Sequence, residues 1–189
     1  MNLALAQIEV EPAKRDRNVE RALEAIGAAA AEGADCVALP EIFDVGYFAF
    51  DAYGRNAEPI GGGTHRAIRA AAVEHDVAVL AGTVVEDLAA SAAAGESVPE
   101  PEGLANTAVL FDGDGDRRLV YRKHHLFGYD SSEAELLVPG DRLPTAEVCG
   151  HTVAVTTCYD LRFPELYRRL LEAGATMVLV PSAWPYPRV

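Results

Sequence analysis

The feature that most constrains the fold is a regular alternation of short apolar runs with amphipathic helical segments. Residues 3–10 alternate apolar and polar residues as a strand does, and residues 15–34 carry apolar residues at helical spacing. A short apolar strand is then predicted over 35–41. A second unit follows, with a predicted helix over 64–76 and a predicted strand over 77–86. This order predicts a layered α/β fold.

The second half of the chain adds a hairpin to this pattern. Residues 106–112 and 117–123 flank a Gly-Asp-Gly-Asp turn, which predicts antiparallel strands and therefore a mixed sheet. Residues 88–104 are rich in Ala, Ser, Pro, Gly and Glu, and they predict a flexible surface insertion. The remaining predicted elements are a strand over 151–158, a helix over 164–175 and a strand over 176–183. We expect one domain spanning 1–189, with Asp16 and Thr64 as helix N-caps.

The charge and hydropathy of the chain exclude several classes of partner. The formal net charge of −13 argues against binding to nucleic acid or to anionic membranes. No apolar run reaches membrane-spanning length, and residues 1–14 predict a strand, not a signal peptide. The basic residues are fourteen arginines and two lysines, Lys14 and Lys123, which together with the acidic excess resembles a salt-adapted composition.

Three cysteines, Cys36, Cys149 and Cys158, show no CxxC spacing, so a disulfide framework is not expected and the cytoplasm is the predicted compartment. Metal sites are not predicted either. The sequence at 112–116 imitates the start of an EF-hand loop, but the sixth and twelfth positions are Arg117 and Lys123 instead of Gly and Glu. We therefore expect no metal site.

Three chemically distinct groups fall at the ends of three predicted strands. Glu41 ends the strand over 35–41, Lys123 ends the second strand of the hairpin, and Cys158 ends the strand over 151–158. Ligands of α/β folds gather at strand ends, and a thiol there, near a helix start, is reachable and easier to ionise. The alternatives are that Cys158 packs in the core, or that a histidine serves as its base; the candidates are His124, His125 and His151.

Three separated blocks of this sequence resemble the signature segments of the nitrilase superfamily of carbon–nitrogen hydrolases. They are GADCVALPEIF, YRKHHLF and TTCYDLRFPELYRRL, in that order. The opening strand and helix, with Asn18, agree with the same family. The resemblance implies a four-layer α-β-β-α sandwich of the nitrilase type and a hydrolase that cleaves the C–N bond of a small amide.

The resemblance also implies that neither a metal nor an organic cofactor is needed, and it assigns roles to individual residues. It makes Cys158 the nucleophile that forms a thioester, Glu41 the general base, and Lys123 with the backbone N–H of Tyr159 the holder of the oxyanion. Glu133 falls on the family's second glutamate, which positions substrate or water. Its alternative, if the register differs by two, is Glu135.

The sequence around Cys158 resembles that of the amidase branch of the family, especially ω-amidase-like enzymes that act on ω-amides of 2-oxo acids. Arg162 is then a candidate partner for a substrate carboxylate, the alternative being a salt bridge with Glu165 or an aspartate. Candidate pocket walls are Tyr47, Phe48 and Phe127. Hydrolysis of an N-carbamoyl amino acid or a nitrile, and a non-catalytic relative, remain alternatives.

Members of this superfamily continue past the point where SAWPYPRV ends this sequence. We therefore expect that the C-terminal part of the domain is missing and that the chain folds poorly alone, because the strand over 176–183 has an unpaired edge. The full-length protein is expected to be a homodimer or a larger homo-oligomer.

Overall fold

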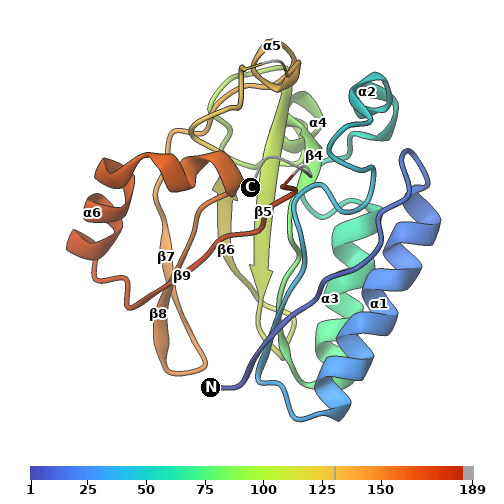
Figure 1. The fold of residues 1–189 in the computed structure, drawn as a ribbon, viewed down its shortest axis with the longest axis vertical. Coiled ribbons are helices and arrows are strands. Elements are labelled where there is room, and N and C mark those ends of the chain that lie inside the picture. Colours follow the sequence, from blue (N-terminus) through green and yellow to red (C-terminus); the bar gives the residue numbers. More distant parts are fainter. Residues whose placement is uncertain (130, 185–189) are drawn as a thin grey trace.

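The computed structural model describes residues 1–129 and 131–184 (Figure 1). The larger sheet contains β1 (Leu3–Leu5), β2 (Cys36–Ala38), β3 (Ala78–Leu80), β4 (Val84–Asp87), β5 (Leu104–Phe111) and β6 (Arg117–Arg122). The smaller sheet contains β7 (Thr145–Val148), β8 (His151–Val155) and β9 (Met177–Leu179). The α-helices are α1 (Arg15–Ala31), α2 (Tyr53–Asn56), α3 (Gly63–His75), α4 (Leu88–Ala93), α5 (Glu133–Leu136) and α6 (Pro164–Glu172). Two short 3-10 helices are η1 (Phe50–Ala52) and η2 (Cys158–Arg162). In the described part of the chain, no helix combines the length and apolar character needed to cross a membrane.

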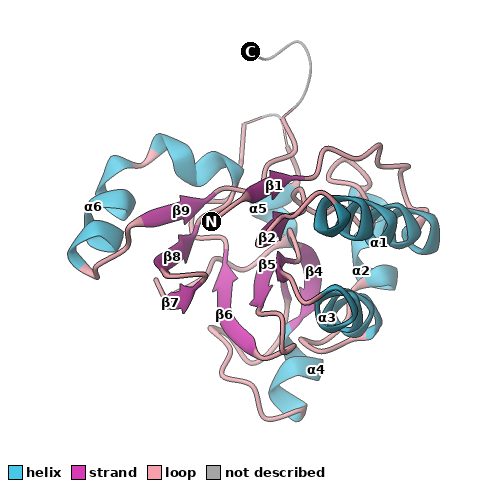
Figure 2. Cartoon of the chain, turned by 90° about the horizontal axis from the view of Figure 1, so that it is seen from below, coloured by secondary structure: helices cyan, strands magenta, loops and turns pink. Residues whose placement is uncertain are grey.

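The elements stack in four layers, as expected for the nitrilase-type sandwich (Figure 2). Helices α1 and α3 pack on the outer face of the larger sheet, and α6 packs on the outer face of the smaller sheet. The inner faces of the two sheets meet in a separate apolar cluster. Both sheets are therefore covered on two sides, which explains why their strands are apolar along most of their length.

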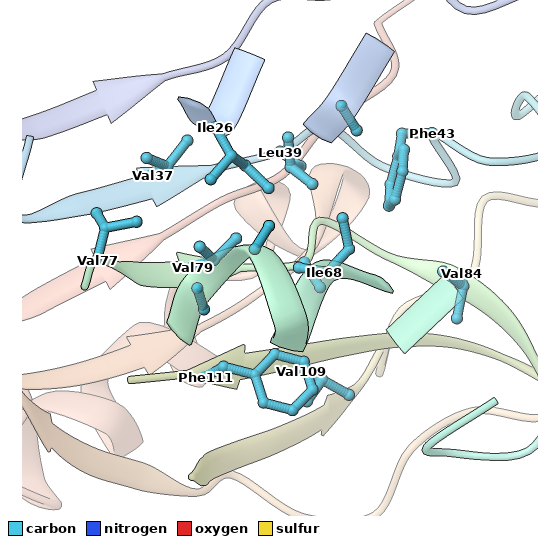
Figure 3. Packing of buried hydrophobic residues seen from close by; sticks show 14 residues of the cluster. Ile26, Val37, Leu39, Phe43, Ile68, Val77, Val79, Val84, Val109 and Phe111 are labelled. Carbon is cyan, nitrogen blue, oxygen red and sulfur yellow. The ribbon is translucent and has the colours of Figure 1, made fainter. Parts of the chain in front are cut away.

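Alternation along the strands divides the apolar side chains between these layers. In β3, Val79 joins the cluster under α1 and α3, whereas Ala78 and Leu80 join the cluster between the sheets. Figure 3 shows Val79 in the first of these clusters, near Ile68 of α3 and Val109 of β5. Because successive side chains of a strand point to opposite faces of the sheet, this one strand contributes to both apolar clusters.

The pairing of the strands confirms a mixed sheet. β1, β2 and β3 are parallel, and β5 and β6 form the predicted antiparallel hairpin. β8 and β9 are parallel, and β9 lies at the edge of the smaller sheet. The carboxyl ends of β2, β6 and β8 therefore point toward one region, the one that carries the candidate site.

The single strand predicted over 77–86 is wrong, because the segment breaks into β3 and β4. Gly82 lies at the break with φ of 51°, and a Cβ atom there would lie 2.0 Å from the Pro40 carbonyl oxygen. Only glycine fits such an approach in this backbone conformation. Both pieces pair with β5, β4 near its start and β3 near its end.

The predicted N-caps are also wrong. Helix α1 begins after Lys14, so Asp16 lies in its first turn. Helix α3 begins after Gly62, and the N–H of Thr64 donates to the Glu58 carboxylate at 2.8 Å. The cap comes from a side chain outside the helix, which local sequence rules do not anticipate.

The predicted insertion over 88–104 is partly helical. Asp87 caps α4 by accepting a hydrogen bond from Ala90 N–H at 3.0 Å, and Leu88 and Ser91 are buried. The Ser91 hydroxyl accepts a hydrogen bond from the Ile60 N–H at 3.0 Å. The first part of this segment is therefore packed structure and not a flexible loop.

Candidate active site

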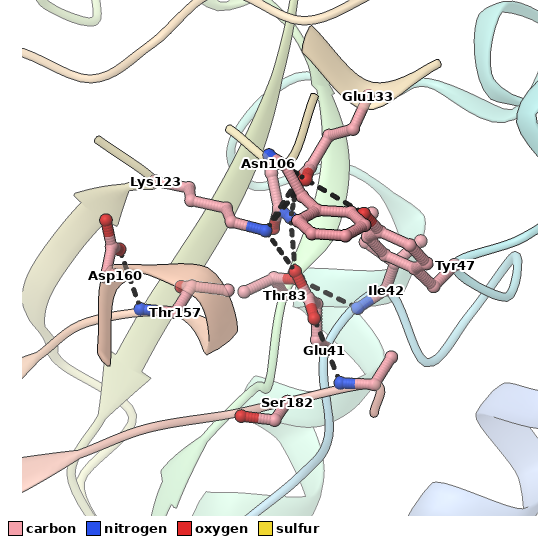
Figure 4. A network of polar contacts seen from close by, with 12 residues as sticks. Glu41, Ile42, Tyr47, Thr83, Asn106, Lys123, Glu133, Thr157, Asp160 and Ser182 are labelled. Carbon is pink, nitrogen blue, oxygen red and sulfur yellow. Dashed lines mark hydrogen bonds and ion pairs between the residues drawn. The ribbon is translucent and has the colours of Figure 1, made fainter. Parts of the chain in front are cut away.

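Glu41, Lys123 and Cys158 come from three separate elements and meet at one end of the sandwich. Figure 4 shows Glu41 and Lys123 in this network. Glu41 lies three residues after β2, Lys123 directly after β6, and Cys158 begins η2 shortly after β8. Lys123 and Glu41 are buried, and Lys123 Nζ lies 2.8 Å from Glu41 Oε1. The strand-end positions of these residues thus bring together the groups that the sequence analysis singled out.

Glu133, at the start of α5, is the second carboxylate at Lys123. Its Oε1 and Oε2 lie 2.8 and 2.9 Å from Lys123 Nζ. Its Oε2 also accepts hydrogen bonds from the Tyr47 hydroxyl at 2.9 Å and from the Phe127 N–H at 2.8 Å. Glu135 is exposed, so the structure places Glu133 and not Glu135 beside the lysine.

Cys158 lies at a sharp turn between β8 and η2. Its φ of 45° is in the left-handed region, and its N–H donates to the Pro181 carbonyl at 3.0 Å. A non-glycine residue in this region is uncommon, and such strain clusters at functional sites. The turn is therefore held in a conformation that the residue type alone does not favour.

The Asp160 carboxylate holds the turn that carries Cys158 in place through hydrogen bonds. It accepts hydrogen bonds from the Thr157 N–H at 2.9 Å, the Tyr121 hydroxyl at 2.6 Å and the His125 N–H at 2.9 Å. It also lies 2.8 Å from Nδ1 of His125. Asp160 is fully buried, so it ties the turn that carries Cys158 to β6 and to the segment that follows Lys123.

The histidine alternative finds no support in the arrangement of the described residues. His125 pairs with Asp160, and His124 stacks on the ring of Tyr121. His151 begins β8, whereas Cys158 follows the opposite end of that strand. The groups that influence the thiol are Glu41, Lys123 and the backbone of Ala183.

The environment of Cys158 disfavours its thiolate. Burial and the Glu41 carboxylate, which is in hydrogen-bonding contact with the thiol, raise the pKa of Cys158 to about 12, and Lys123 opposes them only in part. The expectation that this position eases ionisation is therefore wrong. A protonated resting thiol needs a base in contact with it to become a nucleophile.

The two charged partners differ in how their proton affinities are set. Burial raises the pKa of the Glu41 carboxyl above its ordinary value, Lys123 opposes this shift, and Glu133 adds to it. Burial disfavours the charged form of Lys123, but Glu41 and Glu133 together outweigh it, so the pKa of Lys123 is raised. Lys123 therefore stays charged. Glu41 is a buried carboxylate with increased proton affinity in contact with the thiol, so it is suited to accept the thiol proton.

A cavity of about 80 Å³ opens on Cys158. The Tyr159 ring packs edge-on against Phe127 at a centroid distance of 5.0 Å, and the Arg162 guanidinium lies 5.6 Å from the centroid of the Trp184 ring. The alternative for Arg162, a salt bridge with Glu165 or an aspartate, is not found among the described residues. The lining residues are Tyr47, Phe48, Phe127, Cys158, Tyr159, Arg162, Ala183 and Trp184.

The sequence analysis missed Asn106 and the Ala183 N–H. The Asn106 amide donates to Glu41 Oε1 at 2.9 Å and to Glu133 Oε1 at 3.1 Å, and the Ala183 N–H donates to Glu41 Oε2 at 2.9 Å. Asn106 was detectable in principle, because the predicted hairpin sets it opposite Lys123. Ala183 was not, because its contact spans 142 positions of the sequence. Residues 185–188 of the Trp-Pro-Tyr-Pro-Arg segment lie outside the described residues.

Among the residues that the structure describes, no group of three His, Cys, Asp or Glu side chains is arranged to hold a metal ion. The groups gathered at Cys158 are two carboxylates, one ammonium, one amide and one thiol. Their chemistry is that of proton transfer and covalent attack by sulfur.

Comparisons with known proteins agree with this arrangement. The chain is 35% identical over 165 residues to a 2-oxoglutaramate amidase of Paenarthrobacter nicotinovorans, covering 82% of this chain and 52% of the relative. It is 33% identical over 190 residues to the omega-amidase NIT2 of Homo sapiens, covering 96% and 63%. The chain thus spans between about half and two thirds of the length of these curated relatives.

Solved structures show the same fold. An amidase from Nesterenkonia sp. superposes with a TM-score of 0.83 at 26% identity, covering 100% of this chain and 66% of the other. Nit3 of Saccharomyces cerevisiae, a member of branch 10 of the nitrilase superfamily, gives a TM-score of 0.81 at 28% identity, covering 97% and 65%. The carbon-nitrogen hydrolase family profile matches residues 2–188, so the chain belongs to the carbon-nitrogen hydrolase family.

Proposed function

We propose that this protein hydrolyses the C–N bond of a small linear amide through a thioester on Cys158, releasing ammonia. The observation that carries the proposal is the buried Glu41 carboxylate in contact with both the Cys158 thiol and the Lys123 ammonium. A protonated thiol beside a carboxylate of increased proton affinity is a nucleophile with its base in place. No metal or organic cofactor has a role in this scheme.

In the first half of the reaction, Glu41 takes the thiol proton as Cys158 Sγ attacks the amide carbon. The oxyanion that forms is held by the Lys123 ammonium and the Tyr159 N–H. Because one N–H of Lys123 can serve both oxygens of Glu133, the ammonium keeps a third proton for the oxyanion. The C–N bond then breaks, and Glu41 passes its proton to the departing ammonia.

In the second half, water attacks the thioester carbon with Glu41 again as base. The C–S bond breaks, the carboxylic acid leaves, and the proton held by Glu41 returns to the sulfur. Glu133 orients Lys123 throughout, because its two oxygens face the ammonium and its Oε2 is fixed by Tyr47 and Phe127. Glu41 thus accepts and donates one proton in each half: the thiol proton leaves with ammonia, and the proton taken from water restores the thiol.

The proposed substrate class is the ω-amide of a 2-oxo acid. Relatives of this chain carry the names 2-oxoglutaramate amidase and omega-amidase. The cavity combines aromatic walls with one guanidinium, Arg162, which forms no ion pair among the described residues and ends the short helix that Cys158 begins. An arginine there suits a substrate that has a carboxylate at one end and an amide at the other.

We also propose the cytoplasm as the compartment and a homodimer or larger homo-oligomer as the state of the full-length protein. Cys36, Cys149 and Cys158 are all free thiols, as a reducing compartment favours. The formal net charge of −13 supports a salt-adapted protein. Size-exclusion chromatography with light scattering, at low and molar potassium chloride, tests both the assembly and the salt dependence.

Ammonia release from a panel of amides tests the proposed function. The panel contains 2-oxoglutaramate, glutamine, butyramide, an N-carbamoyl amino acid and a nitrile, at low and molar potassium chloride, with Cys158→Ala as control. We expect release that is fastest with 2-oxoglutaramate and that disappears in the control. A folded chain that releases no ammonia from any compound would favour the non-catalytic alternative.

Arg162→Gln, paired with Arg168→Gln on the exposed surface of α6, tests the carboxylate assignment. We expect Arg162→Gln to raise KM for 2-oxoglutaramate by about tenfold or more, because a charge-assisted contact is lost. It should leave KM for butyramide unchanged, and Arg168→Gln should change neither value. An equal effect of Arg162→Gln on both substrates would remove the arginine from carboxylate recognition.

A further inference from the structure

Asn106 is a fully buried polar residue in the middle of the larger sheet. It lies on β5, and its carbonyl accepts the Lys123 N–H at 2.9 Å, directly after the Thr107–Arg122 pair of the β5–β6 ladder. Residues opposite each other in an antiparallel pair project from the same face. The Asn106 side chain therefore lies beside Lys123, among the groups of the candidate active site (Figure 4).

Both N–H bonds of the Asn106 amide are directed at carboxylates. One reaches Glu41 Oε1 at 2.9 Å, and the other reaches Glu133 Oε1 at 3.1 Å. The opposite orientation of the amide would set its oxygen against two carboxylate oxygens, so the chemistry of the neighbours fixes which atom is the nitrogen. The amide oxygen is buried without a hydrogen-bond partner among the described residues.

These bonds make the two oxygens of Glu41 different. Oε1 accepts from both Lys123 Nζ at 2.8 Å and Asn106 Nδ2 at 2.9 Å. Oε2 accepts the Ala183 N–H at 2.9 Å, and the same N–H acts on the Cys158 sulfur. Oε1 is thus saturated by two donors, whereas Oε2 accepts one donor, shares that donor with the Cys158 sulfur and keeps a free lone pair.

We propose that Asn106 is a positioning residue for proton transfer: its amide holds Glu41 so that Oε2, and not Oε1, takes the Cys158 proton. This inference rests on the proposed function, in which Glu41 is the base. Because the donor is a neutral amide, the carboxylate is oriented without a second positive charge. The cluster keeps one cation for two carboxylates, and Glu41 keeps the proton affinity that a base needs. The unpaired buried amide oxygen is what this arrangement costs in stability.

Two substitutions at Asn106 remove its donors to different extents. Asn106→Leu removes both N–H groups and keeps the same branching of heavy atoms, and the smaller Asn106→Ser leaves one hydroxyl donor. We expect Asn106→Leu to lower kcat/KM by about tenfold to a hundredfold, the lower part of the range for a misaligned general base. We also expect the acid limb of its pH profile to move upward by about one pH unit, because a lost hydrogen bond to the ionised form raises the pKa of Glu41. Asn106→Ser should show a smaller shift in the same direction.

Thr107→Val is the matched control. Thr107 is the next residue of β5, is also fully buried, and donates to a carboxylate, Glu86, at 2.6 Å on the opposite face of the sheet. Its loss removes a comparable buried hydrogen bond outside the site. We expect Thr107→Val to lower thermal stability and to leave the acid limb where it is in the parent protein.

The measurement has two readouts over pH 5 to 9, amide hydrolysis and alkylation of Cys158 by iodoacetamide, resolved by peptide mass spectrometry, with the exposed Cys149 as internal reference. Alkylation needs the thiol proton removed but no amide turnover. If the parent releases no ammonia, the proposed function fails, and the alkylation profile still decides the role of Asn106. If Asn106→Leu does not fold, Asn106→Ser decides. The proposal would be overturned if the pH profiles of the folded Asn106 variants coincide with those of the parent protein and of Thr107→Val.

Discussion

Arg122 and Lys123 are neighbours in the sequence, yet their side chains enter two different buried clusters on opposite faces of the larger sheet. Arg122 binds one carboxylate, Glu86, with Nε at 2.7 Å and Nη2 at 2.8 Å. Lys123 binds two carboxylates, Glu41 and Glu133, each at 2.8 Å. The first cluster lies on the side of α1 and α3, and the second faces the cavity that contains Cys158.

The two clusters differ in charge balance and in the geometry of the cation. In the first, the planar guanidinium matches one carboxylate in a bidentate pair, and the Thr107 hydroxyl completes it. In the second, one ammonium serves two carboxylates, which leaves a net charge of −1 beside the thiol. The first cluster is balanced in charge, whereas the second keeps an excess negative charge that increases its proton affinity, and we attribute the proposed catalysis to that imbalance.

The largest expected effects come from removing each cation in turn. Lys123→Met should lower amide hydrolysis by about a thousandfold, because the oxyanion loses its charged donor. Arg122→Met should destabilise the protein by about 3–5 kcal/mol, since Glu86 is left buried and unpaired, while activity per folded molecule is kept. Chemical denaturation and ammonia release measure the two quantities. Equal losses of activity in the two variants would break the comparison.

Neutralising one carboxylate in each cluster should act on stability in opposite directions. Glu86→Gln leaves Arg122 without a counter-ion and should destabilise the fold by about 3 kcal/mol. Glu133→Gln removes the excess negative charge at Lys123, so stability should be unchanged or higher, while hydrolysis falls by about a hundredfold. Urea unfolding of the two variants at one pH decides this, and destabilisation of the same size in both would show that the clusters are alike.

Asp44 is a buried carboxylate of a third kind, because its oxygens form no hydrogen bond of good geometry among the described residues and have only backbone N–H groups near them. Burial raises the pKa of Asp44 to about 7; the Val45 and Asp44 N–H groups and Arg15 oppose this shift, and Glu58 adds to it. A raised carboxyl pKa contributes stability that is fully present below its ordinary value and is lost as the pH rises through about 7. Asp44→Asn should therefore gain on the parent by about 4 kcal/mol between pH 4 and pH 8. Melting temperatures across this range measure the gain, and a constant difference would contradict it.

The smallest expected effect is on the thiol itself. The Glu41 carboxylate helps to raise the pKa of Cys158, so Glu41→Gln should lower that pKa by about one unit even as it removes the base. Thiolate absorbance near 240 nm, compared with a Cys158→Ala background, reports this titration. A higher thiol pKa in Glu41→Gln would mean that the carboxylate stabilises the thiolate, contrary to the account.

The sequence predicted the layers, the hairpin and the strand-end convergence of Glu41, Lys123 and Cys158, because these depend on local periodicity and on a simple property of sheets. It missed features set by long-range contact. The Glu58 cap of α3 and the Ala183 N–H at Glu41 come from segments that no local pattern connects.

The ionisation of the Cys158 thiol also depends on long-range contacts, so its local sequence did not predict it. A cysteine at a strand end suggests easy ionisation, yet burial and Glu41 reverse that expectation once the layers close over the site. Asn106 is predictable from the sequence only in part. Its position opposite Lys123 follows from the hairpin, but its contact with two carboxylates needs α5 and the segment after β2 in place.

The central claim is that Cys158 attacks an amide with Glu41 as its base, and the most direct test is to trap the thioester. The protein would be mixed with 2-oxoglutaramate or butyramide, quenched in acid within the first turnovers, and analysed by intact and peptide mass spectrometry. We expect an acyl adduct on Cys158 that is absent in Cys158→Ala and strongly reduced in Glu41→Gln. Ammonia release without an adduct, or an adduct on another residue, would contradict it.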